Sequence, residues 1–281
     1  MICGVFSTTG MTQAEAQQRA QDYSDVVPAP LSVTTTRAAD GTFTVTATWP
    51  PCGANTTHAV DAAAASAAAV AAPAGSAAIL NGFDANRDCG KFVTKISAAG
   101  VRFVVRYYSH SAGKNLSFSE AKALSAAGVD LVSVWESAGD HAGFFTRNQG
   151  VDDATTAFNL AQGIGQPSGS PIYFAVDYDA SQTELDAGIL PYFRGVADGF
   201  AAMDHGAGVY TAGVYGSGLV CSVLSGAKLV THTWLSMSSG FRGSKTYQDW
   251  NIKQHLPGDP FGLGFEVDPD EAKPGYGGWK V

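Results

Sequence analysis

Two segments of the chain, ISAAGVRFVVRYYS (96–109) and LSAAGVDLVSVWES (124–137), contain the same junction between a helix and a strand. Each segment passes through Ser-Ala-Ala-Gly-Val into a run of apolar residues. Glycine can end a helix in the left-handed conformation, and a continuous apolar run is typical of a strand that is buried on both faces. The repeated junction indicates repeated helix–strand units.

Apolar runs and amphipathic segments continue to alternate from residue 77 to the C-terminus. Capping boxes at Ser117–Glu120 and Ser181–Glu184 predict two helix starts. Strands buried on both faces fit a closed barrel better than an open sheet, so we predict an α/β fold, a (β/α)8 TIM-like barrel. The eight strand candidates are 77–85, 101–109, 129–137, 171–179, 206–213, 228–238, 251–257 and 261–270.

The N-terminal part of the chain differs in character from the barrel. The pattern of residues 11–27 predicts a helix, and the β-branched runs Leu31–Arg37 and Thr42–Trp49 around Asp40-Gly41 predict a hairpin. The Ala-rich stretch that follows is interpreted as a linker, with a helix packed on the barrel as the alternative. The predicted division is a small α+β docking module at 1–55, a linker at 56–76 and the barrel at 77–281.

Composition excludes several classes of partner. The net charge is -8 and no Lys/Arg cluster occurs, which disfavours nucleic acid. No apolar run is long enough to cross a bilayer, and the N-terminus lacks the positive lead of a secretory signal. The four cysteines are widely spaced; Cys3 and Cys52 could pair, and buried free thiols are the alternative.

Cofactor and metal motifs are also missing from the sequence. No G-x-G-x-x-G follows the first predicted strand, and the six histidines form no H-E-x-x-H pair. Ser217 lacks the G-x-S-x-G spacing of an esterase nucleophile. We therefore expect neither a cofactor nor a metal.

The predicted strands end in polar residues, and in a βα barrel the chemistry lies at these C-terminal ends. Like charges held together raise the pKa of one acid, so that one carboxyl keeps its proton while another is ionised. Glycoside hydrolysis needs this division between two carboxyl groups. The predicted catalytic residues are Asp84, Glu136, Asp177 and Asp179, and the predicted substrate contacts are Arg106, Tyr108, Tyr210, Trp234, Gln254 and Asp268.

Structural roles remain open for several of these residues. Asp84 and Asp179 could cap the helices that follow them. Arg106 could neutralise a buried acid, and Trp234 could be a core residue. Asp268 precedes a proline and could occupy a turn.

The motifs at the strand ends resemble a known family over about residues 77–275. They are Asn-Gly-Phe-Asp84, Val-Val-Arg106-Tyr-Tyr, Ser-Val-Trp-Glu136, Pro-Ile-Tyr-Phe-Ala-Val-Asp177-Tyr-Asp179 and Gly-Val-Tyr210…Val-Tyr-Gly-Ser. This set is similar to the glycoside-hydrolase-like domain of unknown function 1906, a TIM-barrel relative of the family-25 lysozymes, which cut peptidoglycan glycan strands.

The resemblance implies that Asp84, Glu136, Asp177 and Asp179 line a pocket for a cell-wall glycan. The family-25 lysozymes have Asp-x-Glu on the equivalent strand, with the glutamate as the acid. Asp179 is one methylene shorter, and a displacement of about 1 Å can cost about a hundredfold in rate.

Two functions are therefore expected. The first is a peptidoglycan-directed glycosidase, with Asp179 or Glu136 as proton donor and Asp177 as stabiliser or nucleophile. The second is a catalytically weak or inactive glycan-binding or structural module. In that case residues 1–55 would dock it to a larger assembly, such as a bacteriophage tail or a cell-surface complex. Both functions imply an extracellular, cell-wall or virion location.

Overall fold

The computed structural model describes residues 5–11, 13, 17, 32–48, 78–204 and 206–281, in two compact units, Met1–Ala77 and Ala78–Val281. The first unit contains an antiparallel sheet in the order β1-β3-β2. Its strands are β1 (Val5–Met11), β2 (Ser32–Arg37) and β3 (Phe43–Thr48).

The predicted hairpin is the β2–β3 pair, and its turn is held by Asp40, which accepts a hydrogen bond from the backbone N–H of Thr42 at 2.9 Å. Strand β1 was not predicted, and it includes Met11, the first residue of the predicted helix. Gln13 and Gln17 are helical, whereas the rest of that helix, the linker at 56–76, Cys3 and Cys52 lie outside the described residues. A docking role for this unit stays a prediction.

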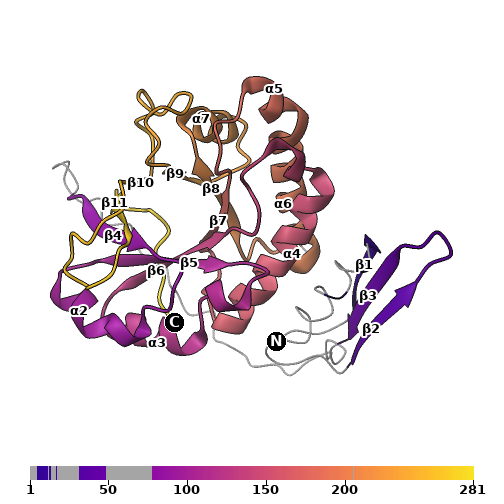
Figure 1. The fold of residues 1–281 in the computed structure, drawn as a ribbon, viewed down its shortest axis with the longest axis horizontal. Helices are drawn as coiled ribbons and strands as arrows, with labels where there is room; N and C mark the ends of the chain where they lie inside the picture. The colour runs from indigo at the N-terminus through magenta and orange to yellow at the C-terminus, as the bar shows by residue number, and fades with distance from the viewer. Residues whose placement is uncertain (1–4, 12, 14–16, 18–31, 49–77, 205) are drawn as a thin grey trace. The chain divides into compact units, whose positions relative to one another are not determined.

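The second unit is a closed barrel of eight strands, which confirms the predicted TIM-like fold (Figure 1). The order around the barrel is β10-β11-β4-β5-β6-β7-β8-β9, and neighbours from β4 to β10 are parallel. The strands are β4 (Leu80–Asp84), β5 (Phe103–Tyr108), β6 (Asp130–Trp135), β7 (Pro171–Ala175), β8 (Thr211–Gly216), β9 (His232–Leu235), β10 (Ile252–Gln254) and β11 (Asp268–Ala272).

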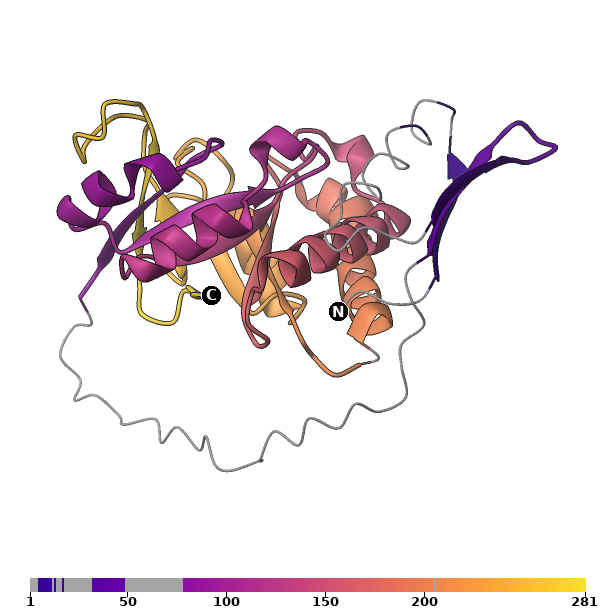
Figure 2. The same cartoon turned by 90° about the horizontal axis from the view of Figure 1, so that it is seen from below.

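Helices follow the first five strands of the barrel and lie outside it (Figures 1 and 2). They are η1 (Gly90–Phe92), α2 (Val93–Ala98), η2 (Ala112–Lys114), α3 (Phe118–Ala126), η3 (Ala142–Phe144), α4 (Arg147–Ile164), α5 (Gln182–Glu184), the π-helical turn η4 (Leu185–Ile189), α6 (Leu190–Asp204) and α7 (Gly218–Gly226). None of the described helices is long and apolar enough to cross a membrane.

The regular alternation stops after α7, which corrects the expected eight-fold βα order. The segment SMSSGFRGSK (236–245) between β9 and β10 is rich in glycine and serine, which favour turns over a packed amphipathic helix. Strand β11 then runs antiparallel to both β10 and β4. Because β11 is reversed, its first residue, Asp268, pairs with Asp84 at the end of β4.

Three strand predictions have other bounds in the structure, and the one at 261–270 is β11, which begins only at Asp268. The strand predicted at 171–179 ends at Ala175, so Asp177 and Asp179 lie in the loop beyond it. The strand predicted at 206–213 is β8, which begins only at Thr211. The last residues of the strand predicted at 206–213 therefore lie at the beginning of β8.

The two predicted capping boxes have different outcomes. At Ser181 both halves form, because the Ser181 side chain accepts from the backbone of Glu184 and the Glu184 side chain accepts from the backbone of Ser181. Ser117 likewise accepts a hydrogen bond from the backbone N–H of Glu120. The Glu120 carboxylate, however, accepts hydrogen bonds from Arg106 and from the backbone of Cys89, so the second half of this box is replaced by a buried ion pair.

Helices α4 and α6 lie side by side and pack at very short range through glycines (Figure 1). A Cβ atom on Gly195 would overlap the carbonyl oxygen of Arg147, and one on Gly150 would overlap that of Tyr192. Backbone atoms cannot move away as a flexible side chain can, so this packing requires glycine at both positions.

We expect Gly195→Ala to lower the free energy of unfolding by at least ~2 kcal/mol, because the new methyl group must separate the two helices. Gly226→Ala is the matched control, since Gly226 ends α7 with no atom within 4 Å of its added Cβ. Urea denaturation of the two variants measures the difference. Equal stability of the two variants would contradict the close helix packing.

Candidate active site

The barrel has a filled lumen, and the alternation of side chains along each strand decides which residues face it. The residues buried in this inner cluster include Tyr107, Val134, Ala175, Tyr215 and Trp234. Continuing each alternation toward the C-terminal ends of the parallel strands leads to Glu136 after β6 and Asp177 after β7. The mouth of the barrel at these strand ends is the candidate active site.

Asp84 lies at the end of β4 and is only 1% exposed. Its carboxylate accepts hydrogen bonds from the Tyr107 hydroxyl at 2.6 Å and from the Gln254 amide at 2.7 Å. Burial, and after it the charge of Asp268, raise the pKa of Asp84 to about 7, against the lowering effect of the two hydrogen bonds. Asp84 is therefore partly protonated at neutral pH.

Strand β11 contributes two acids to the lumen. Because β11 runs antiparallel to β4, its first residues lie at the mouth. Asp268 is half-buried, and burial and the charge of Glu266 raise its pKa. Asp270 is 3% exposed and accepts a hydrogen bond from the Trp234 indole at 2.9 Å. Burial and the charge of Asp84 raise the pKa of Asp270 well above its ordinary value.

Glu136 and Asp177 form the solvent-accessible side of the mouth. Lys114 forms an ion pair with Glu136 at 2.8 Å, and its ammonium lies 4.2 Å from the centre of the Tyr107 ring. Asp177 is exposed, and its backbone N–H donates to the Gly139 carbonyl at 2.7 Å. Partial burial and the charge of Glu136 raise the pKa of Asp177, whereas Tyr215 and Lys114 lower it.

Asp179 is engaged elsewhere. Its carboxylate accepts hydrogen bonds from the backbone N–H and the guanidinium of Arg242, both at 2.7 Å. The structure thus brings Asp84, Glu136 and Asp177 together with Gln254 and Asp268, and it pairs Asp179 with a cation from the β9–β10 loop.

Three predicted substrate contacts on the outer side of the barrel wall are corrected. Arg106 is fully buried and bonds Glu120 at 2.6 Å, which is the structural role left open for it. The Tyr108 hydroxyl donates to Gln166 beneath the helices. Tyr210 precedes β8, so it lies at the opposite end of the barrel, where its hydroxyl donates to the backbone of Gln166.

Trp234 was also predicted to contact the substrate, and the structure corrects this prediction. It is 2% exposed inside the lumen, where it packs against Tyr215 with ring centres 4.7 Å apart. Its role here is to fill the barrel and to donate to Asp270.

The sequence analysis missed Lys114, Asp270 and the two tyrosines that point into the lumen. Tyr107 replaces Tyr108, and Tyr215 replaces Tyr210 as the tyrosine at the mouth. The Tyr215 hydroxyl donates to Gln254 at 2.9 Å. Burial raises the pKa of both hydroxyls far above neutrality, so both remain hydrogen-bond donors. The usable signal was the second Val-Tyr pair, Val214-Tyr215, later in the same segment.

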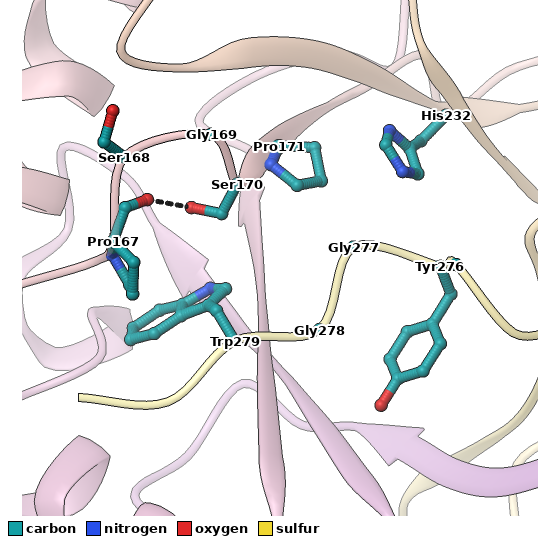
Figure 3. Close-up of a pocket in the computed structure, with 11 residues that line it drawn as sticks. Pro167, Ser168, Gly169, Ser170, Pro171, His232, Tyr276, Gly277, Gly278 and Trp279 are labelled. Atoms are coloured by element: carbon teal, nitrogen blue, oxygen red, sulfur yellow. Dashed lines mark hydrogen bonds between the residues drawn. The ribbon is translucent and has the colours of Figure 1, made fainter. Parts of the chain in front are cut away.

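A separate pocket of 530 Å³ lies at the other end of the barrel, among the strand starts and the C-terminal segment (Figure 3). Its lining contains His232 and Trp279 but no carboxylate, so it has no part in the acid cluster. Burial lowers the pKa of His232, which favours the neutral form of this side chain. In the part of the chain that the structure describes, no group of three or more His, Cys, Asp or Glu residues could hold a metal ion, and Cys89 and Cys221 are buried free thiols.

The chain is similar to several bacterial proteins. It is 35% identical over 138 residues to YbfG of Bacillus subtilis, which covers 47% of this chain and 19% of that protein. It is 31% identical over 112 residues to Rv2525c of Mycobacterium tuberculosis, which covers 36% of this chain and 46% of that protein. The matched regions thus span less than half of the length of these two relatives.

The fold is shared with a solved relative. The crystal structure of Rv2525c, a Tat-secreted protein, superposes with a TM-score of 0.58 at 25% identity, covering 73% of this chain and all of that chain. The family model for the Rv2525c-like, glycoside hydrolase-like domain matches residues 94–268, which confirms the predicted glycoside-hydrolase-like membership. The chain belongs to the Rv2525c-like glycoside hydrolase-like family.

Proposed function

We propose that this protein hydrolyses glycosidic bonds of cell-wall peptidoglycan, outside the cytoplasm, with Asp177 as proton donor and Glu136 as the ionised carboxylate. The observation that supports this most strongly is the convergence of acids from β4, β6, β7 and β11 on one mouth. The relative Rv2525c is described as a putative peptidoglycan hydrolase and as a Tat-secreted protein.

The surroundings of the two accessible acids support these roles. The charge of Glu136 raises the pKa of Asp177, which favours a proton on Asp177. Lys114 balances the charge of Glu136 through a direct ion pair. A protonated acid beside an ionised carboxylate is the pair that protonates the leaving oxygen and stabilises or attacks the anomeric carbon.

Asp84 has a supporting role in this proposal. Both of its oxygens already accept hydrogen bonds, from Tyr107 and Gln254, and it is almost fully buried. It fixes these two side chains at the floor of the mouth and adds to the field that acts on the accessible acids. Asp179, the match to the lysozyme glutamate, is held by Arg242, so we assign it no proton transfer.

The engagement of Asp179 also favours a second candidate, a glycan-binding module that does not cleave. If Asp179 were the required proton donor, its pairing with Arg242 would leave a site that binds a sugar at the floor of the mouth without cleaving it. Release of new reducing ends from purified peptidoglycan separates the two functions, because binding alone releases none.

We expect Asp177→Asn to lower kcat by about a hundredfold or more, the usual contribution of a general acid. Asp179→Asn is the matched variant, and it should change kcat by less than about fivefold, because an exposed ion pair contributes ~1 kcal/mol or less. Reducing-end release by the two variants gives the comparison. If Asp179→Asn lost as much activity as Asp177→Asn, the assignment of the donor would be wrong.

The pH profile tests the charge balance at the mouth. Lys114 lowers the pKa of Asp177, so Lys114→Met should raise this pKa and let Asp177 keep its proton to higher pH. The alkaline limb of kcat should therefore move to higher pH. Lys91→Met, which changes an exposed lysine beside α2, should leave the limb in place. A shift to lower pH in Lys114→Met would contradict the role of Asp177.

A further inference from the structure

Among the described residues, two buried polar atoms without a hydrogen-bond partner belong to side chains of the lumen: Oδ2 of Asp270 and Oγ of Ser236. Asp270 is 3% exposed and Ser236 is 5% exposed. A buried polar atom that is left without a partner costs about 1–3 kcal/mol. Atoms of this kind mark a place where a polar group of a ligand would be stabilised.

Both atoms lie at the floor of the candidate active site. Asp270 follows Asp268 on the inward side of β11, and its other oxygen accepts from Trp234. Ser236 continues the inward alternation of β9 after Trp234, and the next residue, Met237, donates its backbone N–H to Gln254. Gln254 in turn bonds Asp84, and the charge of Asp84 acts on Asp270, so both residues are connected to the buried acid of the mouth.

The surrounding groups favour a ligand that donates hydrogen bonds. The hydroxyls of Tyr107 and Tyr215 already donate to Asp84 and Gln254. The vacant carboxyl oxygen of Asp270 is an acceptor when a donor approaches it, and the Ser236 hydroxyl can also accept. A metal ion does not fit, because no group of three or more candidate ligands occurs among the described residues.

The charge at the mouth favours a positive donor. The charge of Glu136 raises the pKa of both Asp84 and Asp177. The charges of Glu266 and Asp177 raise the pKa of Asp268. Such mutual repulsion between acids is relieved by a cation and is increased by an anion. An ammonium group satisfies both requirements, since it carries three N–H donors and one positive charge.

We propose that the site selects a glycan whose hexosamine carries a free amino group, and that this ammonium donates to Asp270 and Ser236. This selectivity rests on the proposed glycan hydrolysis and names the substrate class within it. An N-acetyl group is uncharged, has one N–H donor in place of three, and adds an acceptor oxygen and a methyl group where the site offers acceptors, so the acetylated sugar is the poorer ligand.

The test compares two tetrasaccharides, one of glucosamine and one of N-acetylglucosamine, by isothermal titration calorimetry with the full chain. We expect the glucosamine tetrasaccharide to bind at least about tenfold more tightly at low salt, which corresponds to ~1.4 kcal/mol. The preference should decrease at high ionic strength, because salt screens the charges of the mouth.

Two variants locate the preference. Asp270→Asn and Ser236→Ala should each reduce it, and Asp270→Asn can still accept from Trp234 through its amide oxygen. Asp198→Asn is the control, since it removes an exposed acid on α6 outside the barrel mouth. A glucosamine preference that survives in both lumen variants would overturn the assignment of these two residues.

Equal binding of the two tetrasaccharides, or tighter binding of the acetylated one, would overturn the proposal. The hydrolysis of peptidoglycan is measured separately by reducing-end release before and after chemical de-N-acetylation. Cleavage of both preparations at equal rates would refute the selectivity and leave the proposed function in place. A glucosamine preference in binding without cleavage of either preparation would support the selectivity and refute the hydrolysis.

Discussion

Successive side chains on a β-strand point to opposite faces, and this constraint decides which polar residues meet in the barrel. Asp84, Tyr107 and Tyr215 point into the lumen, whereas Arg106 and Tyr108 point outward to the helices. A register of β5 shifted by one residue would turn Arg106 into the lumen, away from Glu120 on α3, and would turn Tyr107 toward the helices. The chemistry of the mouth thus depends on the same alternation that packs the core.

The lumen then changes the chemistry of the acids that it receives. Burial is the largest cause of the raised pKa of Asp84, Asp177, Asp268 and Asp270, and the charges of neighbouring acids add to it. Hydrogen bonds from Tyr107, Gln254 and Trp234 partly oppose this effect and hold the carboxyl groups in place. The result is a set of acids whose pKa values are raised to different extents, that of Asp84 to about 7, and acid–base chemistry at a sugar needs acids that differ in this way.

Much of the fold and part of the site follow from the sequence. The repeated Ser-Ala-Ala-Gly-Val junction and the apolar runs predict the barrel, and the strand-end acids Asp84 and Glu136 lie at its mouth. The choice of Tyr108 over Tyr107 could not be made from the pattern, because all six residues of β5 are buried and no polar face marks the inside. The local sequence pattern predicts that Glu120 caps a helix, and only the tertiary fold shows that it pairs with Arg106. The reversal of β11, which moves Asp268 and Asp270 into the lumen, has no local signal in the sequence.

The central claim is that acids from distant parts of the chain converge closely enough for one of them to retain a proton at neutral pH. Carbon-13 NMR titration of the aspartate carboxyl groups tests this claim most directly. The signal of Asp84, assigned by its loss in an Asp84→Asn variant, should titrate near pH 7 and should move to lower pH in Asp268→Asn, because the charge of Asp268 raises this pKa. Titration of Asp84 at the ordinary pKa of an aspartate, about 3.9, with no response to Asp268→Asn, would contradict the account.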